Sequence, residues 1–337
     1  MLNRLPCALV LLVAVGCTSS TEDFEPFTVV TAPNATETRN PDEDYQRTEA
    51  AAEPTPTPAA DSTLVVMLGT GTPNPVPERS GPAVAVIAGG RPYLVDCGPG
   101  VVRRAAAARL AGVTALDMPN LTRLFVTHLH SDHTAGYADL ILTPWVLERV
   151  QPFEVFGPPG IRSMTDHILA AYSEDIDIRL HGSQPQNPTG IEVNAHEIEA
   201  GEIYQDGNVK VTAFEVPHGA WSHAFGFRFD TADRSIVITG DTTATDSVVE
   251  ACNGCDVLVH EVYAEWGLDR RTPDWQDYYR ASHTSGVELG EIAARAQPKL
   301  LVLYHQLLSG ATEEQLLAEI RQSFDGPVVF ADDLDVY

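Results

Sequence analysis

The sequence predicts an α/β domain over residues 63–337. Short apolar runs rich in β-branched residues alternate there with amphipathic stretches, which is the pattern of strands and helices that share one core. Strand-like runs occur at both ends of this part and no repeat of fixed period stands out, so we expect a single domain. The chain of 337 residues is 44% hydrophobic and 20% charged, which is enough apolar material to bury a large core.

Each expected element has a local reason. The strands are runs of Val, Ile, Leu and Phe bounded by Gly, Pro, Asp or Asn, and the helices are longer stretches with apolar residues at helical spacing. In chain order, the expected strands are Leu64–Leu68, Ala83–Ile87, Tyr93–Val95, Leu121–Val126, Val209–Val216, Phe225–Phe229, Ser235–Thr239, Val257–Val259, Leu300–Tyr304 and Val328–Phe330. The expected helices are Val101–Ala111, Tyr137–Val150, Ile161–Tyr172, Thr245–Ala251, Ser285–Ala296 and Glu313–Phe324.

Residues 1–16 resemble a signal peptide of the lipoprotein type. Arg4 precedes an apolar run over residues 5–15, which has the length of a signal-peptide core and is too short to cross a bilayer. The segment from Ala14 to Cys17 resembles a bacterial lipoprotein cleavage box. We therefore expect lipidation of Cys17 and export to the periplasmic face of the outer membrane, with membrane contact through the lipid anchor only. A secreted or soluble periplasmic protein with an ordinary signal peptide is the alternative.

Residues 17–62 are expected to be a disordered acidic tether rich in Pro and Thr, because they lack periodic apolar residues. The net charge of the whole chain is −26. Residues 18–62 hold ten acids and two arginines, and with Arg4 in the leader this leaves −19 on the domain. Proteins that bind nucleic acids normally present a basic face to the phosphates, so this charge argues against a nucleic-acid partner.

Two cysteines at close spacing, Cys252 and Cys255, have two readings. They could form a small disulfide in an oxidising compartment, or they could be two buried thiols. A zinc ribbon is excluded because no second ligand pair stands at suitable spacing.

The strongest chemical signal follows the expected strand Leu121–Val126. His128, His130, Asp132 and His133 place four side chains that can bind metals within six residues. On an extended segment alternate residues point the same way, so His128 and His130 can share one position while the next two face another. Imidazole and carboxylate ligands suit zinc, and strand ends are where α/β sheets place their sites.

Three later residues of ligand type also close strand-like runs. His218 follows Val209–Val216, Asp241 follows Ser235–Thr239, and His305 follows Leu300–Tyr304. A lone polar residue at a strand end is usually a solvated turn residue, but three of ligand type favour metal binding.

These motifs, with Leu68-Gly69-Thr70-Gly71-Thr72-Pro73 and Asp96-Cys97-Gly98-Pro99-Gly100, resemble the metallo-β-lactamase superfamily. The closest resemblance is to its ribonuclease Z branch, because His260-Glu261-Val262-Tyr263 and His283-Thr284-Ser285-Gly286 are similar to branch segments. The resemblance implies a four-layer αββα sandwich with two zinc ions at one edge.

The resemblance also implies a role for each site residue. One zinc would be held by His128, His130 and His218, and the other by Asp132, His133 and His305, with Asp241 bridging them. Asp132 would orient or deprotonate the attacking water, and His260 would protonate the leaving oxygen with Glu261 fixing its orientation. His283 would contact the phosphate oxygens. Asp96 is expected to support the ligands.

The substrate expectation depends on a departure from the branch. Its tRNA-processing members carry a long arm between the residues that match His218 and Asp241, whereas only 23 positions separate them here. The export signal, the acidic domain and this short interval together predict hydrolysis of a small phosphodiester outside the cytoplasm. The alternatives are a carboxylic or sulfate ester or lactone hydrolase, a tRNA 3′-processing endoribonuclease, and a non-catalytic metal-binding lipoprotein. Members of the branch often pair, which predicts a homodimer.

Overall fold

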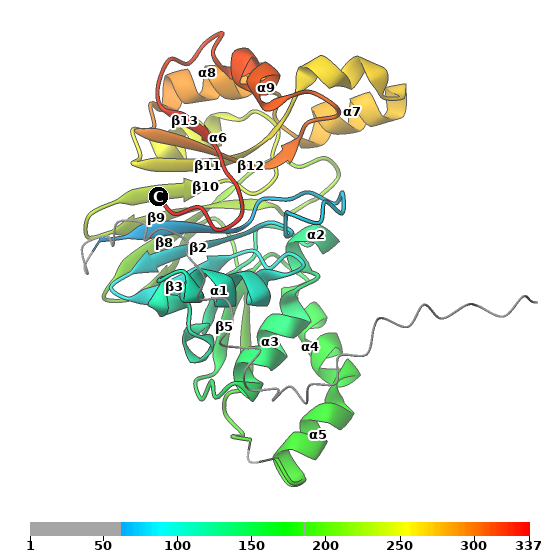
Figure 1. Ribbon diagram of the computed structural model, residues 1–337, viewed down its shortest axis with the longest axis vertical. Coiled ribbons are helices and arrows are strands. Elements are labelled where there is room, and N and C mark those ends of the chain that lie inside the picture. The colour runs from blue at the N-terminus through cyan, green and yellow to red at the C-terminus, as the bar shows by residue number, and fades with distance from the viewer. Residues whose placement is uncertain (1–61, 185) are drawn as a thin grey trace, which may run out of the picture. The chain divides into compact units, whose positions relative to one another are not determined.

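The computed structural model describes residues 62–184 and 186–337 (Figure 1). The expected signal peptide, the lipidation at Cys17 and the expected tether up to residue 61 lie outside the described residues. Among the helices of the described residues, none combines the length and the apolarity that a membrane span needs.

Two β-sheets pack face to face. The first sheet has the order β1-β2-β3-β4-β5-β6 and the second the order β13-β12-β11-β10-β9-β8-β7. The strands of the first sheet are β1 (Leu64–Gly69), β2 (Ala83–Ala88), β3 (Arg91–Val95), β4 (Arg123–Phe125), β5 (Phe153–Gly157) and β6 (Val193–Glu197). Those of the second are β7 (Gly201–Gln205), β8 (Val209–Glu215), β9 (Phe225–Thr231), β10 (Ser235–Ile238), β11 (Val257–Tyr263), β12 (Leu300–Leu307) and β13 (Val328–Phe330).

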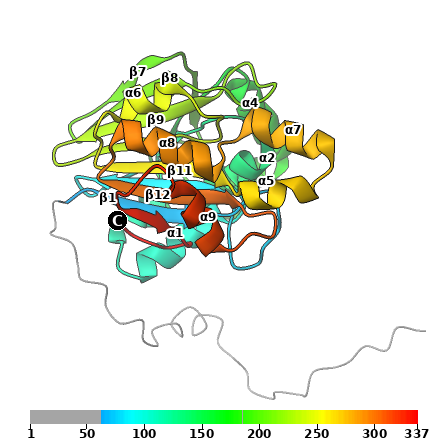
Figure 2. The same ribbon diagram turned by 90° about the horizontal axis from the view of Figure 1, so that it is seen from above.

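Helices cover the outer face of each sheet, so the expected αββα order is confirmed. Figure 1 shows α1 and α3 on one side of the sheets and α8 and α9 on the other, and Figure 2 looks down on α8 and α9. The helices packed on the first sheet are α1 (Val101–Leu110), α3 (Tyr137–Val146) and α4 (Ile161–Ala171). Those packed on the second sheet are α6 (Asp246–Cys252), α8 (Gly286–Ala296) and α9 (Glu313–Ile320). The remaining helices are α2 (Ser131–Thr134), α5 (Ser173–His181), α7 (Pro273–Ser282) and the short 3₁₀ helices Thr114–Leu116, Met118–Asn120 and Glu265–Arg270.

The side-chain alternation of the strands builds separate cores on the two faces of each sheet. In β1, Val65 and Met67 join the core between the sheets, whereas Val66 and Leu68 join the core under α1 and α3. All four are buried, because both faces of the sheet are covered. The sequence of β1 is therefore apolar throughout.

The sequence patterns missed three strands and three helices. The strands β6 and β7 lie at sheet edges and contain no fully buried residue, so they lack the apolar alternation that identifies a half-buried strand. β5 has five residues and stands between two helical stretches. Of the helices, α2 has only four residues, α5 has no buried face, and α7 carries more polar than apolar residues. The expected helix Tyr137–Val150 ends earlier, at Val146, because Glu148 has a positive φ of 73°.

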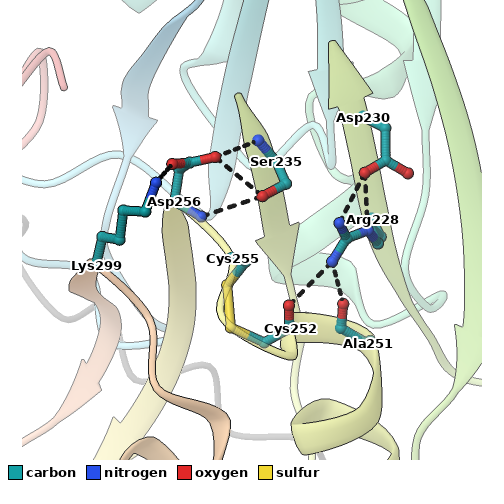
Figure 3. Close-up of a disulfide and its surroundings, with 8 residues drawn as sticks. All are labelled: Arg228, Asp230, Ser235, Ala251, Cys252, Cys255, Asp256 and Lys299. Atoms are coloured by element: carbon teal, nitrogen blue, oxygen red, sulfur yellow. Dashed lines mark hydrogen bonds and ion pairs between the residues drawn. A yellow bond between two sulfur atoms is a disulfide. The ribbon is translucent and has the colours of Figure 1, made fainter. Parts of the chain in front are cut away.

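Cys252 and Cys255 form a disulfide, which decides between the two readings of this pair (Figure 3). The bond joins the C-terminal end of α6 to the segment before β11, and both residues are buried. Arg228 of β9 donates hydrogen bonds to the carbonyl oxygens of Ala251 and Cys252, which are among the last of the helix (Figure 3). The disulfide and this arginine together fix α6 on the second sheet.

Candidate active site

Three histidines that follow two different strands come together at one end of the sandwich. His128 and His130 follow β4, and His218 follows β8. The His128 Nε2 atom lies 2.9 Å from His130 Nδ1, and His218 Nε2 lies 3.1 Å from the same His130 atom. His128 and His218 are buried, whereas His130 is partly exposed. The three side chains expected to share one metal thus point their nitrogens at one another.

A second group comes from α2 and β12. Asp132 and His133 lie on α2, and His305 Nε2 lies 3.2 Å from Asp132 Oδ2. His305 does not end a strand as the sequence suggested but lies inside β12, where it is skipped in the pairing with β11. This residue has a left-handed φ of 45°, and its N–H donates to the carbonyl oxygen of Thr70. The bulge turns the imidazole out of the sheet and toward α2.

Asp241 lies between the two groups. Its carboxylate oxygens are 3.3 Å from His133 Nε2, 3.5 Å from His305 Nε2 and 3.9 Å from His128 Nε2. Burial alone would raise the pKa of Asp241, but the rings of His305 and His133 hold that pKa well below its ordinary value. The carboxylate is therefore ionised, buried and shared, which is the position expected for a bridging residue.

The hydrogen bonds around the cluster engage the Nδ1 atoms of three histidines and leave their Nε2 lone pairs facing the other ligands. The Nδ1 atom of His133 faces Asp96 Oδ2 at 2.8 Å, that of His218 faces the carbonyl oxygen of Ser282 at 2.6 Å, and that of His128 faces the hydroxyl of the preceding threonine at 3.0 Å. A carboxylate or carbonyl oxygen can only accept, and the threonine hydroxyl already donates to Asp96, so each Nδ1 carries the proton and each Nε2 is free to ligate. Asp96 supports a ligand in the way that the sequence analysis expected.

Buried polar atoms without partners provide an independent test of the fit to metal ions. Within the described part of the chain, His133 Nε2 and Asp241 Oδ1 are buried and form no hydrogen bond, although they lie 3.3 Å apart at ion-pair distance. A buried polar atom without a partner is costly, and coordination would satisfy both. His130 fits less well, because Trp221 Nε1 donates to its Nε2 at 2.8 Å. Ligation through His130 Nδ1 would put the proton on Nε2, so the indole of Trp221 must turn away.

The candidate ligand atoms form compact groups. Within each group the atoms lie within 4.8 Å of one another, a spacing that a single ion can span. The groups are His128, His130, His218 and Asp241; Asp132, His133 and His305; and Asp241, His283 and His305.

The two histidines expected to act on the substrate, His260 and His283, lie in different surroundings. His283 lies beside Asp241, with its Nδ1 atom 3.9 Å from Asp241 Oδ2 and 3.4 Å from Glu261 Oε1. His260 is fully buried, and its Nδ1 faces the carbonyl oxygen of Glu261 at 2.6 Å. The carboxylate of Glu261 accepts instead from the backbone N–H of Thr284.

The Glu261 side chain contacts Thr242, Thr284 and His283, and its expected role in orienting His260 stays a prediction. Neighbouring residues on strand β11 point to opposite faces, so the carboxylate of Glu261 turns toward His283. Burial alone would lower the pKa of His283, but Glu261 and Asp241 outweigh burial and raise it. Glu261 thus lies at ion-pair distance from His283.

A cavity of about 550 Å³ opens beside the cluster, and we call it the active-site cavity. Its floor contains candidate ligands, and its wall is formed by the helix α7, which lies at the same end of the sheets as α2 in both views (Figures 1 and 2). His283 lines it, whereas His260 is absent from the described lining residues. The lining residues are Pro73, Asn74, His130, Ser131, Asp132, Asp241, Arg271, Asp274, Trp275, Tyr278, Tyr279, His283, His305 and Leu307.

The wall of this cavity was not predicted from the sequence. Trp275, Tyr278 and Tyr279 belong to α7, which was not expected as a helix. A signal was available, because Thr272-Pro273 places a capping residue before a proline at the first helical position. Aromatic residues in that helix could then have been placed on one face.

Comparisons with known proteins agree with this geometry. Residues 91–306 match the model of a β-lactamase superfamily domain. A protein named ribonuclease Z from Mycobacterium bovis is 35% identical over 280 residues, covering 80% of this chain and 96% of the relative. The ribonuclease Z of Mycobacterium marinum gives the same identity and coverage. Together with the fold and the ligand cluster, these matches define a metal-dependent hydrolase.

The chain belongs to the metallo-β-lactamase superfamily, and the expected likeness to its ribonuclease Z branch is confirmed. Solved structures share the fold. A human tRNase Z, short form, has a TM-score of 0.61 at 24% identity, covering 81% of this chain and 98% of that one. A metallo-β-lactamase fold protein from Bacillus subtilis has a TM-score of 0.63 at 19% identity, covering 82% and 99%.

Proposed function

We propose that this chain is a dinuclear zinc phosphodiesterase. The observation that carries the proposal is the shared carboxylate of Asp241 between two sets of ligand atoms. His128, His130 and His218 would hold one ion, and Asp132, His133 and His305 the other. Histidine and carboxylate donors suit zinc. Zinc bound in such a site activates water near neutral pH and neutralises charge that develops on a phosphate.

The protein's own residues supply the remaining steps in this proposal. Asp132 lines the active-site cavity and can accept a proton from a water beside it. His283 also lines the cavity, and its raised pKa suits a donor to a phosphate oxygen, with Glu261 behind it as the positioning residue. The role of His260 as the acid that protonates the leaving oxygen stays a prediction, because its ring is fully buried and does not line the cavity.

The relatives favour tRNA 3′-end processing as a second candidate function. Proteins named ribonuclease Z are 35% identical to this chain, and a tRNase Z shares its fold. The chain covers 96% of the length of the Mycobacterium bovis relative, so little of that relative remains to form an arm that this chain lacks. The short interval between His218 and Asp241 therefore excludes tRNA less strongly than the sequence analysis supposed, and the homologues fit this alternative better than a small substrate.

Other observations favour a substrate outside the cytoplasm. The net charge of −26 opposes binding of a polyanion, and disulfides such as Cys252–Cys255 persist mainly in oxidising compartments. We propose export on these grounds, and lipidation at Cys17 on the likeness of residues 14–17 to a lipoprotein cleavage box. Ester or lactone hydrolysis and a homodimer stay predictions.

The test compares two substrates on the same zinc-loaded protein. We expect hydrolysis of bis-p-nitrophenyl phosphate that a chelator abolishes, that zinc restores, and that Asp241→Asn lowers at least 100-fold. Asp256→Asn is the matched control, because its carboxylate pairs with Ser235 and Lys299 outside the cluster (Figure 3). Absence of metal-dependent hydrolysis would refute the proposal. Efficient removal of a 3′ trailer from a tRNA precursor would select the second candidate over a small diester.

A further inference from the structure

The indole of Trp221 lies against the first ligand group, which consists of His128, His130 and His218. Its ring centroid is 4.9 Å from that of His130, with the two ring planes nearly perpendicular at 89°. Its Nε1 atom donates a hydrogen bond to His130 Nε2 at 2.8 Å. Trp221 is 38% exposed and is absent from the described lining residues of the active-site cavity. The proposed chemistry therefore gives this residue no role.

The backbone of Trp221 is fixed by the loop that also carries a ligand. The N–H of Trp221 donates to the carbonyl oxygen of His218 at 3.0 Å, and the N–H of Gly219 donates to that of Ala281 in α7 at 2.9 Å. The imidazole of His218 is held by the neighbouring carbonyl group of Ser282. A change in the contact between the indole and the ligands must therefore come from rotation of the Trp221 side chain.

The hydrogen bond from Trp221 determines which nitrogen of His130 carries the proton. Nε2 accepts from the indole, so its lone pair is occupied, and in a neutral imidazole the proton is then on Nδ1. That Nδ1 atom lies 2.9 Å from His128 Nε2 and 3.1 Å from His218 Nε2, both of which carry lone pairs. The N–H of His130 is thus shared between two nitrogens at the place expected for an ion.

Ligation requires the other tautomer of His130. A metal ion binds a nitrogen lone pair, so the proton must leave Nδ1, and a ring that stays neutral then carries a proton on Nε2. The Nε2–H and the indole N–H are both donors, and neither atom can accept from the other. Trp221 can relieve this conflict only by turning its side chain away from His130.

The other histidines on this side of the cluster show the opposite arrangement. The Nδ1 atom of His133 faces Asp96 at 2.8 Å, so the proton stays away from the cluster and Nε2 keeps its lone pair. The Nδ1 atoms of His128 and His218 also face oxygen atoms. Of these four histidines, His130 alone is held by a hydrogen bond in the tautomer that cannot ligate.

We propose that Trp221 is a gate on metal loading, which holds His130 in the tautomer of the metal-free protein and is released when the first ligand group binds an ion. This inference rests on the proposed ligand assignment and adds a residue outside the ligand set. A hydrogen bond between neutral groups contributes a factor of roughly 2 to 12 to an equilibrium constant. Trp221 therefore lowers the zinc affinity of this group by about that factor, and bound zinc disfavours the indole contact by the same factor.

The first test measures zinc affinity on the full chain, separately from hydrolysis, by competition against a chromophoric chelator. We expect Trp221→Phe to raise the affinity for one of the two ions roughly 2- to 12-fold. Phe keeps an aromatic ring beside His130 and removes the N–H donor. Trp266→Phe is the matched control, because Trp266 is similarly exposed, at 45%, but packs on Arg270 instead, and its replacement should leave zinc affinity unchanged.

The second test follows tryptophan emission during a zinc titration and needs no variant to fold. The emission of the wild type should change, because the released indole leaves its contact with His130. Zinc has no redox chemistry, so the change reports movement of the indole. We expect the change to be absent from Trp221→Phe and to remain in Trp266→Phe.

The outcomes separate the gate from the proposed function. Zinc affinity that Trp221→Phe leaves unchanged or weakens, or a gain that Trp266→Phe shares, would overturn the gate. Wild-type emission that stays constant up to saturation with zinc would overturn the release of the indole. A protein with the expected zinc responses that does not hydrolyse bis-p-nitrophenyl phosphate would reject the proposed function and keep the gate. Hydrolysis together with an unchanged zinc affinity in Trp221→Phe would do the reverse.

Discussion

Replacement of Asp96 by Asn tests whether the hydrogen bonds behind the cluster prepare it for metal. Asp96 is 1% exposed and accepts from the backbone N–H of Thr127, from its hydroxyl, and from His133 Nδ1. Asn keeps the shape and tolerates the positive φ of 59° at this position, so the backbone should not change. It can still accept at one oxygen. The amide group that replaces Oδ2 would instead present a donor to the His133 N–H.

The expected fall in zinc affinity follows from the loss of the hydrogen bond between Asp96 and His133. A hydrogen bond to a charged group contributes about 1.5–3 kcal/mol, and His133 would move its proton to Nε2 to recover a partner. The lone pair expected to face a metal would then be lost. We expect zinc affinity to fall about 10- to 100-fold, which corresponds to about 1.4–2.8 kcal/mol.

The assay is competition for zinc against a chromophoric chelator, with unfolding by urea measured on the metal-free protein. Asp256→Asn makes the same chemical change at a carboxylate that contacts Ser235 and Lys299, and it should leave zinc affinity within twofold of the wild type. Wild-type zinc affinity in Asp96→Asn, in a protein that remains folded, would refute the idea that Asp96 fixes the His133 proton.

Three further substitutions test the scaffold, each by urea unfolding. Gly69→Ala should lower the free energy of unfolding by more than about 2 kcal/mol, because the added Cβ would overlap a backbone carbonyl oxygen, whereas Gly207→Ala meets nothing within 4 Å and should stay within about 0.5 kcal/mol of wild type. Arg149→Met should lower it by about 3 kcal/mol or more, because the buried guanidinium donates to four backbone carbonyl groups, and Arg149→Lys should not rescue it, since an ammonium lacks the planar fork. Replacing Cys252 and Cys255 by Ser should cost about 2 kcal/mol, the loop-closure value for a short loop, and dithiothreitol should have the same effect on the wild type but none on the variant. Unchanged unfolding in any of the three would contradict the packing or cross-link described for that residue.

The sequence by itself determined the α/β class, most buried strands and the ligand types, because burial on both faces leaves continuous apolar runs and the ligands follow them. It also placed His128, His130, Asp132 and His133 in one segment, where local geometry brings them together. The edge strand β7 escaped notice because its side chains are half solvated and carry no apolar alternation.

Only the tertiary structure decided how distant segments meet. The bulge that turns His305 toward α2 depends on pairing between β11 and β12. The pairing of Glu261 with His283 depends on which face of β11 meets the loop before α8. The position of α7 over the active-site cavity likewise arises from contacts far apart in the chain. Local propensity cannot encode these arrangements, because each is fixed by packing between segments that are remote in sequence.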